Sequence, residues 1–164
     1  MKAEPEFDLR RFVKDLQSRG MPYLLIGRWA VILHGAPLMT ADYDFWISPG
    51  HRERLLALLE RQGFEVPARS RWNRPLLTVY RGADKIDLQS HSAVTNEEGR
   101  RVEFKDCLAR AETRFDASGA FSIRVPCIGD LIALKKVRRS NPQDALKDST
   151  DVRFLEAIRR KREQ

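Results

Sequence analysis

The sequence predicts a single domain of the mixed α/β (α+β) class, and two observations lead to this fold class. The chain has 164 residues, the usual length of one domain, and its 42% of hydrophobic residues are enough to form a core. Short runs typical of strands are interspersed with segments in which apolar residues recur at helical spacing. We therefore expect one domain over residues 1–164, with a strand-rich half at 1–92 and a mainly helical half at 93–164.

The first half is expected to alternate helices with short strands that form one sheet. Apolar residues at helical spacing predict a helix over residues 7–17, with Asp8 as its N-cap and Gly20 as its stop. The other helices expected here cover residues 29–33, which Gly35 closes, and residues from Ser48 and Pro49 to Gly63. The strands expected here cover 23–26, 42–47, 64–66, 76–80 and 85–89, and the last two form a hairpin around residues 81–84.

The second half is expected to be mostly helical. Its segments are, in order, a polar loop at 95–101, a helix within 102–111, a hairpin over 115–125 broken at 118–119, a helix over 128–139, and a last helix over 143–160. Asn141 and Pro142 separate the last two helices because the residue before a proline disfavours helical backbone.

Charge and cysteine content restrict the function class only loosely. The net charge of +7 favours polyanions such as nucleotides or RNA, although 32% charged residues also fit an ordinary solvated surface. Cys107 and Cys127 have neither the spacing of a redox pair nor histidines at zinc-ligand spacing, so we expect two ordinary buried thiols. No apolar run approaches the roughly 20 residues of a membrane span, and the N-terminus is unlike a secretory leader. We therefore expect a cytoplasmic protein without membrane contact.

Two carboxylates in one predicted strand form the first chemical signal. Side chains alternate across a strand, so Asp42 and Asp44 share one face while Tyr43, Phe45 and Ile47 share the other. Same-face neighbours lie only about 6 to 7 Å apart, and two buried anions at that distance are costly without a cation. Magnesium, which prefers carboxylate, water and phosphate oxygens, is the natural partner.

A third acid and a glycine complete the pattern. Asp87 lies between Ile86 and Leu88 in the hairpin strand, and beside the Asp42 strand it would meet the other two carboxylates. The three acids could then bind metal and accept a hydroxyl proton. Upstream, Gly27 permits a sharp turn at a helix start, where free backbone amides favour phosphate.

These residues resemble a known superfamily in two places. The first is Ile26-Gly27-Arg28 followed, after a spacer, by Thr40-Ala41-Asp42-Tyr43-Asp44, and the second is Asp130 to Lys135 followed by Lys147, Asp148 and Asp151. Both are similar to nucleotidyltransferases related to DNA polymerase beta, and more closely to small bacterial nucleotidyltransferases related to abortive-infection toxins of toxin–antitoxin systems. In those proteins a lysine of the helical segment reaches the nucleotide.

The resemblance implies a fold, a reaction and a set of site residues. It implies a minimal nucleotidyltransferase fold, with a small mixed sheet flanked by helices and the catalytic core in residues 1–92. Asp42, Asp44 and Asp87 would hold two Mg²⁺ ions, with Mn²⁺ as a substitute, and Asp87 would be the base. A nucleoside triphosphate would bind near Gly27, Arg28, Thr40 and Lys135. The acceptor would be a hydroxyl of RNA, protein or a small molecule, with tRNA favoured for a toxin that an antitoxin protein neutralises.

Two departures from the superfamily pattern keep an alternative open. Arg28 stands where a small residue lets phosphate approach, so it either blocks the cradle or binds a phosphate itself. Leu38 follows Pro37 where relatives often carry arginine. The alternative is a catalytically degenerate module that binds a nucleotide, RNA or a protein partner. The basic cluster Lys136, Arg138 and Arg139, with residues 159–162, would then contact RNA or simply face solvent.

Overall fold

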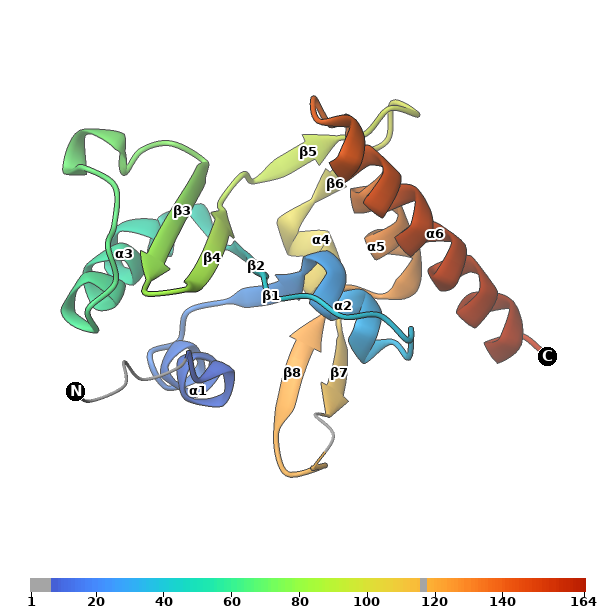
Figure 1. Cartoon of the computed structure of the whole chain (residues 1–164), viewed down its shortest axis with the longest axis horizontal. Coiled ribbons are helices and arrows are strands. Elements are labelled where there is room, and N and C mark those ends of the chain that lie inside the picture. The colour runs from blue at the N-terminus through green and yellow to red at the C-terminus, as the bar shows by residue number, and fades with distance from the viewer. Residues whose placement is uncertain (1–6, 116–117) are drawn as a thin grey trace.

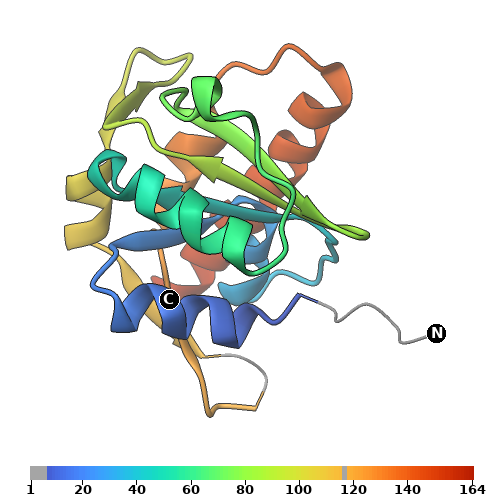
Figure 2. The same cartoon turned by 90° about the vertical axis from the view of Figure 1, so that its left-hand side faces the viewer.

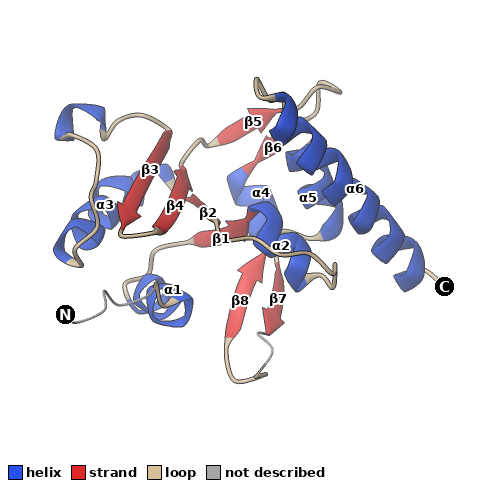
Figure 3. Ribbon diagram, in the orientation of Figure 1, coloured by secondary structure: helices blue, strands red, loops and turns tan. Residues whose placement is uncertain are grey.

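The structure is a computed structural model that describes residues 7–115 and 118–164. Its centre is a four-stranded mixed sheet in the order β1-β2-β4-β3 (Figures 1 and 3). The strands are β1 (Tyr23–Ile26), β2 (Tyr43–Ile47), β3 (Leu76–Arg81) and β4 (Asp84–Gln89). Strand β2 runs antiparallel to β1 and parallel to β4, and β3 and β4 form the predicted hairpin. The predicted fold class and mixed sheet are confirmed.

Helices cover both faces of this sheet. On one face lie α1 (Leu9–Ser18) and α3 (Arg52–Arg61), and beyond the other lie α5 (Ile128–Lys135) and α6 (Pro142–Arg162) (Figures 1 and 2). The predicted cap of the first helix is present, because the Asp8 carboxylate accepts a hydrogen bond from the Arg11 backbone N–H. The core under α1 and α3 contains Phe45, Ile86 and Leu88, the residues that alternate with the acids of β2 and β4.

Two small hairpins complete the second half. Strand β5 (Ala93–Thr95) pairs with β6 (Arg101–Glu103), and β7 (Glu112–Phe115) pairs with β8 (Ser122–Val125). Helix α4 (Phe104–Ala109) lies between them in the chain, within the range predicted for a helix. The expected break at residues 118–119 lies next to residues 116–117, which are outside the described residues. Cys107 and Cys127 are free thiols; Cys107 is buried as predicted, whereas Cys127 is only partly buried.

Four segments differ from their prediction. Residues 64–66 form no strand, only a single bridge between Glu65 and Tyr80. The helix expected at 29–33 is α2 (Gly27–Leu33), which begins two residues earlier, directly after β1. The helix expected to reach residue 139 ends at Lys135. The polar stretch at 95–101 is a loop as predicted, but the short strands β5 and β6 that flank it were not predicted, because three-residue strands give too little alternation to detect.

No helix among the described residues is long and apolar enough to cross a membrane.

Candidate active site

Gly27 and Asp44 are in direct contact where β1 meets α2. Strand pairing places Asp44 opposite Ile26, and the chain turns at Gly27 with a φ of 69°, in the left-handed region that favours glycine. A Cβ atom at position 27 would collide with the Asp44 carboxylate and lie 2.9 Å from the Asp44 Cβ. The glycine is therefore required both for the turn and for the room that the Asp44 side chain occupies.

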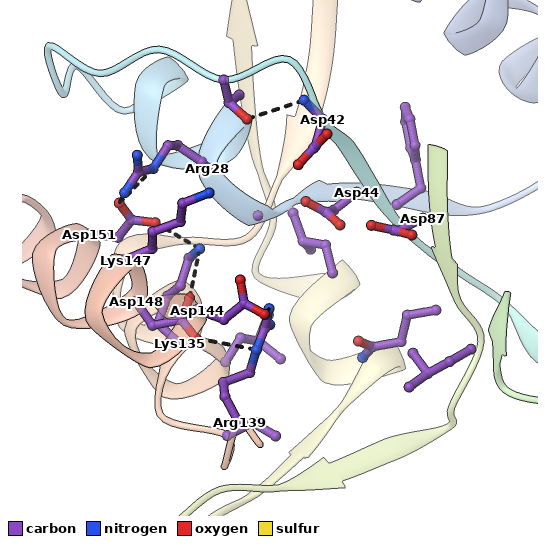
Figure 4. Close-up of a pocket in the computed structure, with 18 of the residues that line it drawn as sticks. Arg28, Asp42, Asp44, Asp87, Lys135, Arg139, Asp144, Lys147, Asp148 and Asp151 are labelled. Atoms are coloured by element: carbon purple, nitrogen blue, oxygen red, sulfur yellow. Dashed lines mark hydrogen bonds and ion pairs between the residues drawn. The ribbon is translucent and has the colours of Figure 1, made fainter. Parts of the chain in front are cut away.

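Asp44 and Asp87 lie side by side in adjacent parallel strands. The β2–β4 register pairs Asp44 with Asp87, and both side chains project from the face opposite the core (Figure 4). The Thr78 hydroxyl on β3 donates a 2.6 Å hydrogen bond to Asp87 Oδ1, and Lys85 Nζ lies 3.4 Å from Asp87 Oδ2. These contacts fix the orientation of the Asp87 carboxylate toward Asp44.

The proximity of these two acids changes the protonation of Asp44. Burial and then the negative charge of Asp87 raise the pKa of Asp44 to about 7, against the opposing effect of Lys135. Asp44 has no ion-pair partner of its own among the described residues, so Lys135 and Lys85 compensate the charge of the two carboxylates only in part. A divalent ion would supply the remaining positive charge, and one or two carboxylates plus phosphate oxygens are the ligands that magnesium uses.

Asp42 lies at the edge of this pair. It is exposed and precedes β2, and its backbone N–H donates a 3.2 Å hydrogen bond to the Thr40 hydroxyl. Its negative charge also contributes to the raised pKa of Asp44. Within the described residues no group of three acidic, histidine or cysteine side chains is close enough to hold a metal by itself. We call Asp42, Asp44 and Asp87 the carboxylate wall.

A second set of acids lies on α6 and is paired with cations. Asp151 is 1% exposed and receives the Arg28 guanidinium through Nε at 3.1 Å and Nη2 at 2.9 Å. Lys135 Nζ lies 2.9 Å from the other oxygen of the same carboxylate. Arg28, which the sequence placed in or over the phosphate cradle, is thus turned toward α6 (Figure 4).

The remaining acids of this α6 face are paired in the same way. Lys135 Nζ also donates to Asp148 Oδ1 at 3.4 Å, and Arg139 lies 3.4 Å from Asp144 and 3.8 Å from Asp148. We call Asp144, Asp148 and Asp151, with Arg28, Lys135 and Arg139, the ion-paired wall. Lys147 extends from α6 into the pocket and has no ion-pair partner among the described residues (Figure 4).

The two walls enclose one pocket of about 800 Å³ between the sheet and helices α5 and α6. Each of the seven site residues predicted from the sequence lines it: Gly27, Arg28, Thr40, Asp42, Asp44, Asp87 and Lys135. Sequence reasoning missed Thr78, Lys85 and Gln89 as site residues. The hairpin register could have indicated Thr78, because pairing Arg81 with Asp84 also pairs Thr78 with Asp87.

A sheet with paired strand-borne acids beside a glycine turn is what the sequence resemblance to nucleotidyltransferases implied, and the comparisons with known proteins agree. The chain belongs to the aminoglycoside-2''-adenylyltransferase family, whose model matches residues 8–130. It is therefore an enzyme of the nucleotidyltransferase superfamily, as the sequence resemblance predicted.

Three solved structures show the same fold at low sequence identity. Lincosamide antibiotic adenylyltransferase LnuA with bound lincomycin has a TM-score of 0.62 and 15% identity over 90% of this chain and 94% of that chain. ANT(2'')-Ia in complex with adenylyl-2''-tobramycin has a TM-score of 0.53 and 16% identity over 92% and 94%. A nucleotidyltransferase-like protein of Paracoccidioides brasiliensis has a TM-score of 0.53 and 15% identity over 90% and 72%. No curated protein sequence matches the chain.

Proposed function

We propose that this enzyme transfers a nucleoside monophosphate from a nucleoside triphosphate to a hydroxyl group of a small acceptor molecule. The observation that carries the proposal is the Asp44–Asp87 pair, held side by side by the strand register and packed against Gly27. A pocket of about 800 Å³ has room for a nucleotide together with a small acceptor. The fold shared with enzymes that bind lincomycin and adenylylated tobramycin supports an antibiotic-like acceptor.

In this proposal the carboxylate wall binds two divalent ions, magnesium or manganese. Asp44 and Asp87 are the main ligands, and Asp42 at the pocket edge adds a further carboxylate. When bound, these ions neutralise charge on the α-phosphate and on the leaving pyrophosphate. Asp44, whose pKa burial and Asp87 raise to about 7, must lose its proton to act as a ligand.

Asp87 also serves as the base in this proposal. The acceptor oxygen forms a bond to the α-phosphorus, the bond from that phosphorus to pyrophosphate breaks, and the hydroxyl proton passes to the Asp87 carboxylate. The hydrogen bond from Thr78 occupies Oδ1, which holds the carboxylate in one rotamer and leaves Oδ2 for the proton. Lys85, at 3.4 Å from Oδ2, stabilises the ionised carboxylate before transfer.

The cations of the opposite side of the pocket are proposed to bind the triphosphate. Lys147 is the cation best placed for this role because its ammonium group is not engaged by a described acid. Arg28 and Lys135 add positive potential from fixed positions, since Asp151 holds both. Thr40 contributes indirectly, because its hydroxyl accepts the Asp42 backbone N–H.

An RNA acceptor is a second candidate, and one observation favours it. Arg159, Arg160 and Lys161 are exposed at the end of α6, where they could contact phosphates. The toxin role, the tRNA substrate and the antitoxin partner all stay predictions. Incubation with labelled triphosphates and total RNA tests them: labelled RNA would favour this candidate, and label confined to small acceptors would exclude it.

The test of the main proposal is transfer of label from α-labelled ATP, GTP, CTP or UTP to lincomycin or tobramycin with and without Mg²⁺. Asp44→Asn and Asp87→Asn should each reduce transfer by about 10³-fold or more, because each removes metal-binding charge and the second also removes the base. Asp106→Asn, an acid on α4 outside the pocket, should leave transfer unchanged. Undiminished transfer by the Asp44 and Asp87 variants would disprove the proposed site.

A further inference from the structure

The three acids of the carboxylate wall share their face of the sheet with one lysine. In β4, Lys85 and Asp87 alternate with buried core residues, and both line the pocket. The register of the parallel strands β2 and β4 pairs Asp44 with Asp87. Two residues earlier in both chain segments, the same register places Asp42 beside Lys85. The lysine therefore has Asp87 as its neighbour along the strand and Asp42 as its neighbour across to the next strand.

The ammonium group of this lysine is held at the carboxylate of Asp87. Lys85 Nζ lies 3.4 Å from Asp87 Oδ2, while the Thr78 hydroxyl donates to Oδ1. Both oxygens of this carboxylate therefore have a partner within the protein. The negative charges of Asp87 and Asp42 raise the pKa of Lys85, against the opposing effect of burial, so the lysine is charged at neutral pH.

This charge opposes the binding of a divalent ion at the same acids. An ion that is bound by Asp87 enters the field of the Lys85 ammonium, and like charges at such short range repel each other. With Lys85 included, the fully ionised carboxylate wall has a formal charge of −2, which a single divalent ion neutralises. The lysine therefore weakens the attraction of the carboxylate wall for divalent ions.

Lys85 is free to move away when an ion binds. The side chains of Lys85 and Asp87 are 39% and 35% exposed, so the flexible stem can carry the ammonium into water without leaving a buried charge. Lys135 differs in this respect, because it is 11% exposed and is held by both Asp148 and Asp151. One lysine of the pocket is thus fixed by the fold, whereas the other is exchangeable.

We propose that Lys85 is the internal counterion of the carboxylate wall: it competes with the divalent ion for these acids and so sets the ion concentration that the enzyme requires. The assignment rests on the proposed function, because that proposal makes Asp44 and Asp87 the main metal ligands. It deepens the proposal by naming the residue that opposes metal loading. Lys85 is a positioning residue for the metal ligands and does not itself contact the reacting atoms.

The test measures Mn²⁺ binding to the nucleotide-free protein by isothermal titration calorimetry. Lys85→Met removes the charge and keeps a side chain of similar length, so it should bind Mn²⁺ about fivefold more tightly than wild type. Lys85→Arg retains the charge and should bind Mn²⁺ as wild type does. Lys136→Met is the matched control: it makes the same charge change at a lysine that pairs with Glu98 outside the pocket, and it should leave the affinity unchanged.

A second measurement separates this role from that of an ordinary structural ion pair. Without metal, Lys85→Met should have a lower Tm than wild type, because Asp87 loses its cation. Mn²⁺ at one fixed concentration should raise the Tm of the variant more than that of wild type, because the ion binds the variant more tightly. A lysine with a merely structural role would lower the Tm by the same amount with and without Mn²⁺, and that result would overturn the proposal.

The double variant Lys85→Met/Asp87→Asn shows whether the gain arises at the proposed site, because it should lose the tighter Mn²⁺ binding of the single variant. Equal or weaker Mn²⁺ binding by Lys85→Met, or an equal gain in Lys136→Met, would overturn the role of Lys85 alone. The same holds if neither protein binds Mn²⁺ while wild type still transfers nucleotide. If wild type shows neither Mn²⁺ binding nor transfer, the proposed function fails and the role of Lys85 fails with it.

Discussion

The two walls of the pocket each carry three aspartates, but they differ in how far these aspartates are paired with cations of the protein. On the ion-paired wall each aspartate has at least one lysine or arginine within 3.4 Å. On the carboxylate wall Asp44 and Asp87 contact each other, and Lys85 is the one cation within ion-pair distance among the described residues. Acids that are compensated within the fold hold helices in place, whereas the acids of the carboxylate wall, left largely uncompensated, are the ones we propose to bind a cation that the fold does not supply.

The energetic cost of leaving the carboxylate wall with few cations falls on Asp44. Its pKa rises to about 7 because it is buried and faces Asp87, and this penalty is retained in the folded protein. A carboxyl with such a raised pKa in a pocket is a candidate functional group. Asp151 is more deeply buried than Asp44, at 1% exposed, but it receives two cations, which makes it structural. The following substitutions test this contrast, beginning with the largest expected effect.

Asp151→Asn should destabilise the protein by about 3 to 5 kcal/mol, because it leaves Arg28 and Lys135 without their shared buried partner. Chemical denaturation measures the change. Asp148→Asn is the matched control on the same helix. Burial raises the pKa of Asp148 and thus already disfavours its charged form, so this control should cost clearly less. Equal costs for the two variants would contradict the special role given to Asp151.

Gly27→Ala should destabilise the protein by about 3 kcal/mol, through backbone strain and the collision with Asp44, and should abolish transfer. Gly20 has a similar φ of 63° but open space around it, so Gly20→Ala measures the strain alone. The difference between the two variants in free energy of unfolding isolates the contact with Asp44. If it is near zero, the carboxylate wall does not depend on this contact.

Asp44→Asn should stabilise the metal-free protein by about 2 kcal/mol above pH 7, with a rise in Tm of several degrees. The folded-state pKa of about 7 lies above the ordinary value of 3.8, so the wild-type protein loses stability as the pH rises from 4 through 7. The asparagine variant does not titrate, and its advantage should vanish near pH 4. Added Mg²⁺ should stabilise wild type more than the variant. A Tm difference independent of pH would show that Asp44 is not the titrating group.

The contrast between the walls also shows what the sequence can and cannot reveal. Alternation within β2 and β4 predicted that Asp42 and Asp44 share a face and that Asp87 approaches them, because strand geometry is local and regular. The partners of Arg28 and Lys135 lie on α6, and no local rule predicts which acids a distant helix presents. The spacing of Asp144, Asp148 and Asp151 does place them on one helical face, so their common direction was predictable but their cations were not.

The role of Gly27 shows the same limit. The sequence predicted a sharp turn at a helix start, and the turn is present. The room that the missing side chain leaves for Asp44 depends on the β1–β2 register, which is a tertiary property. Lys85 was missed for a related reason, since its significance lies in its 3.4 Å distance to Asp87, and this becomes visible only when its neighbours are placed.

The smallest effect is expected for Asp144→Asn, at the exposed end of the ion-paired wall. The Arg139 and Asp144 side chains are 48% and 39% exposed, so water and salt screen the pair, and its loss should cost less than about 1 kcal/mol. The cost should disappear in 1 M salt, whereas that of Asp151→Asn should largely persist, because burial limits screening. Denaturation of both variants at low and high salt measures this. A large, salt-independent cost at Asp144 would mean that the ion pairs of this wall form one network. The stabilisation could then not be assigned to Asp151 alone but only to Asp144, Asp148 and Asp151 together.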